Sequence, residues 1–173
     1  AGDGSVWVAA TNGLWRVQAG TAQAQHVAAA QLRATSSVIV DGSGQVRIGT
    51  SDGLYGIDAH GDARRLWPTD GAYAVTAIAA DAQQRLWLGV AGHGIAIFDA
   101  ARDHVHWSRP DPMGPGRLPD ANITTLMPDR SGLLWIGTHN RGLVRTDMAG
   151  APFRYLFDRA ASVAAPDGNN VQA

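Results

Sequence analysis

The stretch that decides the fold reads Asp129-Arg130-Ser131-Gly132-Leu133-Leu134-Trp135-Ile136-Gly137-Thr138. Its first part, from the aspartate to the glycine, is typical of a tight turn, and its second part is typical of a β-strand. Similar phrases occur three more times, and the four centres are Trp7, Arg47, Trp87 and Trp135. The centres lie 40, 40 and 48 residues apart. A repeat of about 40 residues predicts the blades of a β-propeller.

The copies also agree around the central phrase. The aspartate that opens the turn recurs, and so do the central tryptophan and the glycine that follows it. These structural repeat residues are Asp41, Asp81, Asp129, Trp7, Trp87, Trp135, Gly49, Gly89 and Gly137. Ala1 replaces the aspartate in the first copy, and Arg47 replaces the tryptophan in the second. We expect Arg47 either to stack across its neighbours or to lie at an edge of the ring.

Each copy reads as four short strands separated by turn residues. In the third copy we expect strands at residues 75–80, 85–90, 94–98 and 104–107. Short strands that are separated by turn residues at regular intervals are typical of antiparallel meanders. One four-stranded sheet cannot bury both its faces, so neighbouring sheets have to stack on each other. The sequence therefore predicts an all-β, partial β-propeller over residues 1–173, with four repeat units at about 1–40, 41–80, 81–128 and 129–173.

The C-terminal residues bear on the size of the ring. Residues 166–171 echo residues 118–123, and Asn170 lies 48 residues after Asn122. The echo predicts the start of a fifth blade, and two interpretations follow. We favour a part of a larger ring, whose exposed sheet edges pair with the remaining blades or with a second copy of the chain. Alternatively, the last strand pairs with the first blade, in the same chain or in a second copy.

The composition excludes several classes of protein. The formal net charge is −1, which gives no general attraction to nucleic acid. The chain has no cysteine, so neither disulfides nor thiolate chemistry is expected. No apolar run approaches the roughly 18 residues that a membrane helix needs. We therefore expect no nucleic acid partner, and attachment to a membrane only through segments outside this sequence.

Residues 129–147, which contain the opening stretch, closely resemble the two-component regulator propeller repeat, and the other copies match it in part. The resemblance implies a seven-bladed ring in the extracytoplasmic, periplasmic half of a membrane-bound sensor. The cytoplasmic half of such a sensor is a histidine kinase or a diguanylate cyclase. The segment itself would then bind a ligand rather than catalyse a reaction. The resemblance leaves the partner open between a small molecule, saccharides included, and a protein.

The two ends of each predicted sheet differ in sequence. The turns after the first and third strands of a meander lie at one end, which we call the turn rim. The loops after the second and fourth strands lie at the other end, which we call the loop rim. The loop rim varies from copy to copy, as a binding surface on a repeated scaffold does. Its candidate ligand-binding residues are Asn12, Asp52, His93, Arg109, Arg117, His139, Asn140 and Arg141.

These candidates offer donors to a carboxylate, a phosphate or sugar hydroxyls. The competing interpretation is that they are ordinary solvated loop residues. We interpret the repeated aspartates as residues that bond the backbone of their own turn, because the Asp-x-Ser-Gly pattern lacks the further oxygen ligands of a calcium loop. His104 and His106 point the same way from one strand, but no third zinc ligand is evident nearby. We expect no metal, no cofactor and no catalytic residue.

Two alternative functions stay open. The first is an enzymatic propeller that resembles the streptogramin lyases, with His93 or His139 as the catalytic residue. The second is an architectural ring that holds a sensor dimer together. The enzymatic alternative is not favoured, because no recognisable nucleophile motif occurs in the sequence.

Overall fold

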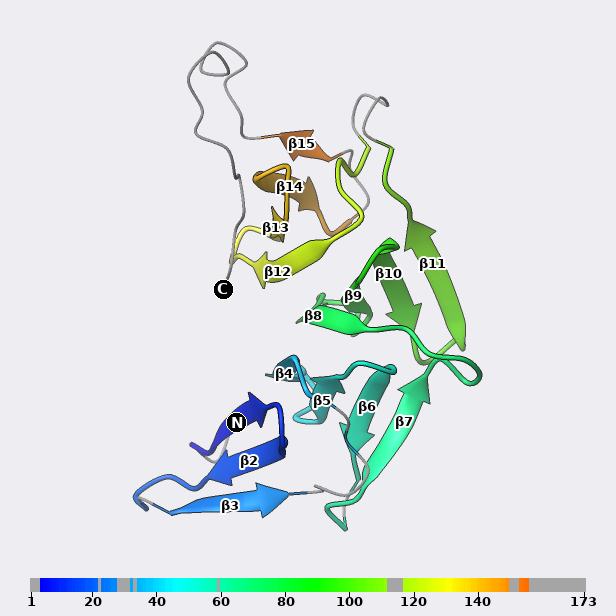
Figure 1. The fold of residues 1–173 in the computed structure, drawn as a ribbon. Coiled ribbons are helices and arrows are strands. Elements are labelled where there is room, and N and C mark those ends of the chain that lie inside the picture. Colours follow the sequence, from blue (N-terminus) through cyan, green and yellow to red (C-terminus); the bar gives the residue numbers. More distant parts are fainter. Residues whose placement is uncertain are drawn as a thin grey trace. The chain divides into compact units, whose positions relative to one another are not determined.

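The described part of the chain is built only of strands and turns. The structure, a computed structural model, describes residues 4–21, 23–27, 32, 34–58, 60–111, 117–149 and 153–155. These residues form fifteen strands in four sheets and contain no helix (Figure 1). The all-β prediction is therefore confirmed.

Each sheet is a meander in which strands that follow one another in sequence are hydrogen-bonded neighbours. The first sheet contains β1 (Val6–Ala10), β2 (Gly13–Val17) and β3 (Ala24–Val27). The second contains β4 (Ser37–Val40), β5 (Val46–Gly49), β6 (Leu54–Ile57) and β7 (Ala63–Trp67). The third contains β8 (Val75–Ala80), β9 (Leu86–Val90), β10 (Gly94–Asp99) and β11 (His104–Ser108). The fourth contains β12 (Ile123–Pro128), β13 (Leu133–Thr138), β14 (Leu143–Asp147) and β15 (Arg154–Tyr155).

The strands of the third sheet agree with the predicted ones to within one residue at either end. Four-stranded meanders of this kind are propeller blades. The chain divides into two compact units, residues 1–78 and 79–173, and each is described here by itself. The unit boundaries predicted for the repeats and the seven-bladed ring stay predictions. The predicted start of a fifth blade, at residues 166–171, lies outside the described residues.

The second strands of the later repeats contribute strongly to the core. β9 is buried along its whole length, and in β9 and β13 Leu86, Leu88, Leu134 and Ile136 are at most 3% exposed. The equivalent valines of β1 differ sharply, since Val6 is 59% and Val8 is 44% exposed. β1 is an edge strand of a three-stranded sheet, whereas β9 and β13 each have a neighbour on both sides. The first sheet therefore presents an exposed apolar edge, whereas the equivalent residues of the third and fourth sheets are buried.

One aspartate organises the turn before the second strand in the second, third and fourth repeats. In the fourth sheet, Asp129 Oδ1 accepts hydrogen bonds from the backbone N–H groups of Ser131, at 2.8 Å, and Leu133, at 3.1 Å. Its Oδ2 accepts one from Trp135 Nε1 at 2.8 Å. A single carboxylate thus joins the turn to the centre of the strand. The repeated aspartate and tryptophan recur together because they form one hydrogen-bonded unit.

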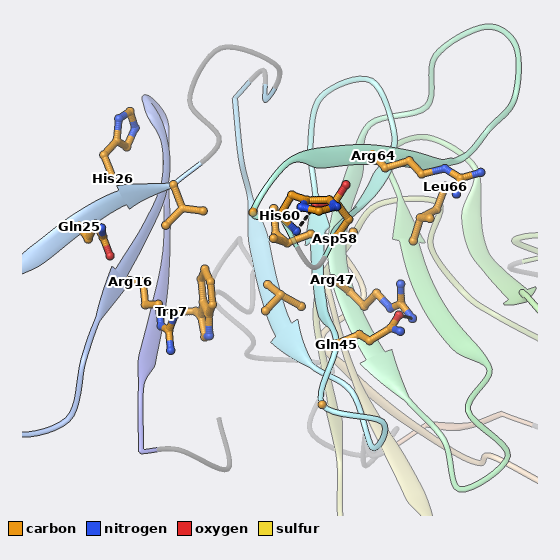
Figure 2. A pocket seen from close by; sticks show the side chains of 16 residues that line it. Trp7, Arg16, Gln25, His26, Gln45, Arg47, Asp58, His60, Arg64 and Leu66 are labelled. Atoms are coloured by element: carbon orange, nitrogen blue, oxygen red, sulfur yellow. Dashed lines mark hydrogen bonds between the residues drawn. The ribbon is translucent and has the colours of Figure 1, made fainter.

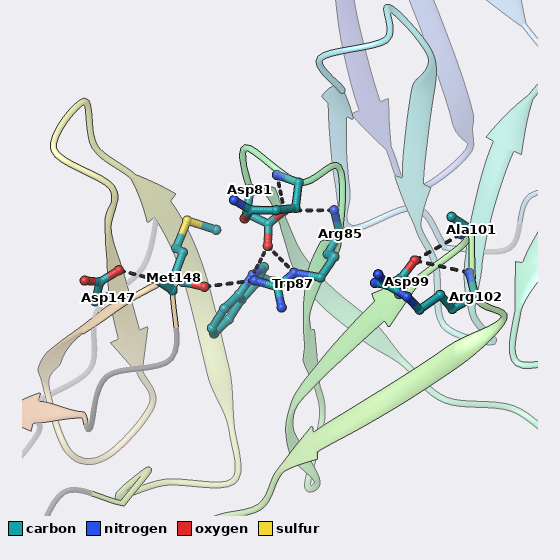
Figure 3. Close-up of polar contacts among 10 residues, drawn as sticks. Asp81, Arg85, Trp87, Asp99, Ala101, Arg102, Asp147 and Met148 are labelled. Carbon is teal, nitrogen blue, oxygen red and sulfur yellow. Dashed lines mark hydrogen bonds and ion pairs between the residues drawn. The ribbon is translucent and has the colours of Figure 1, made fainter.

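The third sheet repeats this arrangement with one addition. Asp81 accepts from the backbone N–H groups of Gln83 and Arg85, each at 2.9 Å, and from Trp87 Nε1 at 3.2 Å (Figure 3). Arg85 Nε also donates to the Asp81 carboxylate, at 2.7 Å. The turn ends with Gln84 at φ 63°, where the second and fourth repeats have a glycine. Gln84 therefore adopts the left-handed backbone conformation that the equivalent glycines adopt, although glycine suits this conformation best.

Arg47 takes the role of the missing tryptophan. Its Nε donates to Asp41 Oδ2 at 2.7 Å, the oxygen equivalent to the one that Trp135 contacts in the fourth sheet. The sequence did not predict this contact, and the expectation that Arg47 stacks across its neighbours or lies at an edge of the ring stays a prediction. Burial acts to raise the pKa of Asp41, but hydrogen bonds from Ser43, Gln45 and Arg47 outweigh it and lower the pKa. The second repeat keeps the turn-to-strand link with a different N–H donor.

Replacement of Arg47 tests this role. Asp41 is only 8% exposed, so its carboxylate would lose a charged partner in a buried place. We expect Arg47→Leu to lower the free energy of unfolding by about 1–3 kcal/mol. Arg47→Trp should lower the free energy of unfolding by less, because an indole N–H can donate to the same Asp41 oxygen. Chemical denaturation measures both variants, and equal losses would show that the donor is not what stabilises the turn.

The acid stability of the fold should depend on Asp129. Hydrogen bonds from Ser131 and Trp135 lower the pKa of this carboxyl from 3.8 to about 2. A carboxyl with a lowered pKa stabilises the fold above its unfolded pKa, so this contribution is lost as pH falls from about 4 to about 2. The stability advantage of the unchanged protein over Asp129→Asn should therefore shrink across this range. Urea unfolding at a series of pH values measures the difference in the free energy of unfolding. Asp70→Asn, which changes an exposed carboxylate, is the control. A constant difference would contradict the assignment.

Candidate functional site

The loop rim of the second unit carries most of the candidate residues. Three segments make it up: residues 91–93 between β9 and β10, residues 109–122 between β11 and β12, and residues 139–142 between β13 and β14. Residues 112–116 of the middle segment lie outside the described part of the chain.

Asp120 and Asn122 tie the three segments together. The Asn122 side-chain oxygen accepts from the Gly92 N–H at 2.9 Å, and its backbone oxygen accepts from the His139 N–H at 3.0 Å. Asp120 Oδ2 accepts from the Asn140 N–H at 2.8 Å, while its Oδ1 accepts from the N–H of Asn122. Asp120 is only 8% exposed. The loop that follows β9 is therefore held by the Asn122 side chain, and the loop that follows β13 by the Asp120 side chain and the Asn122 backbone.

A row of planar side chains lies beside this junction. The Arg109 guanidinium carbon lies 5.0 Å from the centre of the Trp107 ring, within the range of a cation–π contact. The His93 ring lies on the same indole with 6.1 Å between ring centres. His93 Nδ1 is 2.8 Å from the carbonyl oxygen of Ala91, which can only accept, so Nδ1 carries the proton. Arg109 is exposed and His93 is half-buried.

The other candidates of this unit are exposed. Arg117, His139, Asn140 and Arg141 all present their side chains to solvent. The backbone of the last three is fixed, since the Arg141 N–H also donates to the Thr138 hydroxyl at 3.1 Å. A fixed backbone removes the backbone part of the entropy that is lost on binding, while the exposed side chains still lose rotamer freedom.

The two candidates of the first unit are held within their own loops. The Asp52 carboxylate accepts from the hydroxyls of Thr50, at 2.7 Å, and Tyr55, at 3.1 Å. Asn12 is exposed, and its side-chain oxygen accepts from Trp15 Nε1 at 3.3 Å. Asp52 thus stabilises the loop that contains it, and its part in ligand binding stays a prediction.

The structure brings six of the eight candidates onto loops of one unit. These six are His93, Arg109, Arg117, His139, Asn140 and Arg141. The sequence reasoning missed Trp107, Asp120 and Asn122, which support them. A signal for the last two was available, because residues 118–123 are echoed by residues 166–171. This similarity indicates the repeat, and the Asp120 and Asn122 side chains within the first segment also hold the loops.

The contacts of this rim fix loop backbones and leave charged side chains exposed. The hydrogen bonds described above hold the loop backbones in place. Arg109, Arg117 and Arg141 supply exposed charged donors for an oxyanion or for hydroxyl groups. Within the part of the chain that the structure describes, no three histidine, aspartate or glutamate side chains lie close enough to hold a metal ion.

Comparison with known proteins supports the repeat. Residues 117–140 match the family model described as the two component regulator propeller. The resemblance predicted from the sequence is therefore confirmed for this stretch, which includes the loop junction at Asp120 and Asn122. A search of the curated proteins found no matching sequence.

Solved structures share the fold. The chain is similar to the extracellular domain of the putative hybrid two component system BT4673 from B. thetaiotaomicron, with 18% identity and a TM-score of 0.73. The match covers 98% of this chain and 23% of that one. The extracellular domain of BT3049 from the same organism gives 22% identity and a TM-score of 0.62 over 79% of this chain and 18% of that one.

An enzyme also appears among the similar folds. Virginiamycin B lyase from Staphylococcus aureus gives 11% identity and a TM-score of 0.69, over 89% of this chain and 52% of that one. At such identities the likeness shows the fold, which hosts both sensor domains and enzymes. The chain spans less than a quarter of the two sensor domains. No helix that could cross a membrane occurs among the residues described.

The loop junction can be tested by hydrogen exchange. Asn122→Ala removes the acceptor of the Gly92 N–H but leaves the backbone oxygen that the His139 N–H uses. We expect exchange at Gly92 to become about tenfold faster. Nuclear magnetic resonance measures the rate. Asn140→Ala, which trims an exposed side chain of the same rim, should leave it unchanged. Equal rates in Asn122→Ala and the unchanged protein would contradict the junction.

Proposed function

We propose that this chain is part of an extracytoplasmic, periplasmic sensor propeller and that its loop rim binds a small ligand. The observation that carries the proposal is the junction at Asp120 and Asn122. It fixes the backbone under several exposed donors that differ from repeat to repeat. A fixed backbone with variable exposed side chains is the usual construction of a binding site on a repeated scaffold.

The chemistry of the rim defines the ligand class. The exposed arginines suit carboxylate, phosphate or sulfate groups, and the side-chain amide of Asn140 suits hydroxyl groups. Arg109 over Trp107 adds a flat surface against which a ring can lie. Sugars and organic acids meet these requirements. The alternative is a protein partner, and a screen in which no small ligand binds would favour it.

Signalling requires more than binding. A ligand shifts a sensor between two states only if it binds one of them more tightly. In the proposed sensor, tighter binding to one state of the ring shifts the equilibrium between the two states of an attached kinase or cyclase. The similarity to extracellular domains of hybrid two component systems supports this role and the extracytoplasmic location. The propeller segment itself would carry no catalytic residue.

The edge of the first sheet supports a second element of the proposal. Val6 and Val8 are exposed on β1, while the equivalent positions in the other sheets are buried. An exposed apolar edge strand is a template for a further strand. We propose that β1 pairs with a strand from the remaining blades of a larger ring or from a second copy.

A thermal-shift screen of the complete ectodomain against sugars, peptides and organic acids tests the function. A ligand at one hundred times its dissociation constant should raise the unfolding free energy by about 2.7 kcal/mol. Arg141→Gln should reduce this shift. Arg102→Gln on the turn rim should not, since Arg102 is highly exposed and pairs only with Asp99 at 2.6 Å among the ion pairs seen in the described residues (Figure 3). The proposal fails if no ligand shifts the transition and signalling survives deletion of the ring.

A further inference from the structure

The first sheet has two faces that differ in exposure. Residues opposite each other in an antiparallel pair share a face, and residues alternate between the two faces along a strand. Val8 lies opposite Trp15, so these residues share one face with Val6, and we call it the front face. Trp7 and Leu14 belong to the other face, which we call the back face. Leu14 is fully buried, whereas Val6 and Val8 are 59% and 44% exposed.

The second sheet shows what a front face packs against. It carries, 40 residues later, the equivalents of the front-face residues of the first sheet, which are Val46, Ile48 and Tyr55. They form one buried cluster with Leu14 of the first sheet, and Trp7 and Val27 of the same back face pack against it. Trp7 also lines a groove together with residues of the second sheet (Figure 2). In the first unit, the front face of one sheet therefore packs on the back face of the sheet before it.

The front faces of the other three sheets are buried. Their residues at the positions of Val6, Val8 and Trp15 are at most 8% exposed. In the third and fourth sheets these residues are Leu86, Leu88, Ala96, Leu134, Ile136 and Val144. The exposed valines of the first sheet thus occupy positions that the repeat uses for packing. A continuous apolar face of this kind marks an interaction surface.

The back face of the fourth sheet is also incompletely covered. Leu143 lies opposite Gly137 there and is half-buried. The residues equivalent to Leu143 in the other sheets are all 0% exposed, and they are Leu14, Leu54 and Ile95. Met127 lies opposite Trp135 on the same back face and is 58% exposed. Among the described residues, the large apolar side chains that are exposed are Val6, Val8 and Met127, and all three lie on these two faces.

We propose that the front face of the first sheet in one copy of the chain packs on the back face of the fourth sheet in a second copy. The contact would repeat the one that the first and second sheets make, with Val8 in the place of Ile48 and Leu143 in the place of Leu14. It deepens the proposed larger ring, on which it rests, because it names a second copy as the source of the further sheets.

The proposed contact joins two different faces, so it is heterologous, and such contacts either close into a ring or continue from copy to copy. Each copy contains four sheets, and two copies contain eight. Propellers are typically built from four to eight blades. We therefore expect a closed pair of copies, in which the same contact is made twice.

Sedimentation equilibrium of the 173-residue chain tests the proposal over a range of protein concentrations. We expect reversible association of the chain into pairs. A chain that stays monomeric at every concentration would overturn the proposal. The proposed ligand binding would not fall with it, because that function uses the exposed residues of the loop rim rather than these two faces.

Variants test which faces meet. Val8→Lys on the front face and Met127→Glu on the back face should each weaken pairing at least about tenfold, because each places a charge in an apolar contact. Both side chains are exposed within one copy, so the fold should tolerate the changes. Ala101→Lys, in an exposed turn away from both faces, is the control and should pair like the unchanged chain. Loss of pairing in Ala101→Lys equal to that in Val8→Lys would overturn the proposal.

A mixture of the two variants separates this contact from one that joins two identical faces. A mixed pair holds one unaltered contact, between the first sheet of the Met127→Glu copy and the fourth sheet of the Val8→Lys copy. The mixture should therefore associate more tightly than either variant alone. Association no tighter than that of the separate variants would overturn the proposal. If Val8→Lys does not fold, Val6→Lys takes its place in both experiments, because Val6 is the more exposed of the two valines.

Discussion

In each of three successive repeats, one aspartate carboxylate joins a turn to the middle of the strand that follows it. One oxygen of Asp41, Asp81 or Asp129 accepts the backbone N–H groups of the turn, and the other accepts a side-chain N–H from the strand. A carboxylate has about four acceptor positions, so it can satisfy both sets of donors at once. The turn rim therefore keeps the same geometry in each repeat, and the sheets are free to vary elsewhere.

The opposite rim is held by different means. There the loops are fixed by Asp120 and Asn122, which belong to the segment entering the fourth sheet and contact loops of the third and fourth. Since these contacts use mostly backbone groups of the loops, the loop side chains are not committed to the scaffold. His139 and Arg141 are exposed for this reason. The residues exposed on such loops can change without loss of the fold.

The first sheet departs from the repeat next to its central tryptophan. Where the third sheet has Arg85 bridging to its neighbour, the first sheet has Ser5, and Arg16 lies over Trp7 instead. A groove of about 910 Å³ lies in this unit, and Trp7 and Arg16 are among its lining residues. Residues at equivalent places of the repeated sheets therefore make different contacts.

The sequence by itself determined the strands, the turns and their repetition, because these depend on neighbours within a few residues. The strands of the third sheet and the Asp–Gly turns are of this kind. Only the tertiary structure decided what Arg47, Asp52, Asp120 and Asn122 do. Arg47 replaces an indole N–H with a guanidinium N–H, which no pattern of residue types reveals. Asn122 reaches Gly92, 30 residues away in sequence, because the sheets pack side by side. Such contacts depend on how separate repeats approach each other, and that is a property of the folded chain rather than of any one segment.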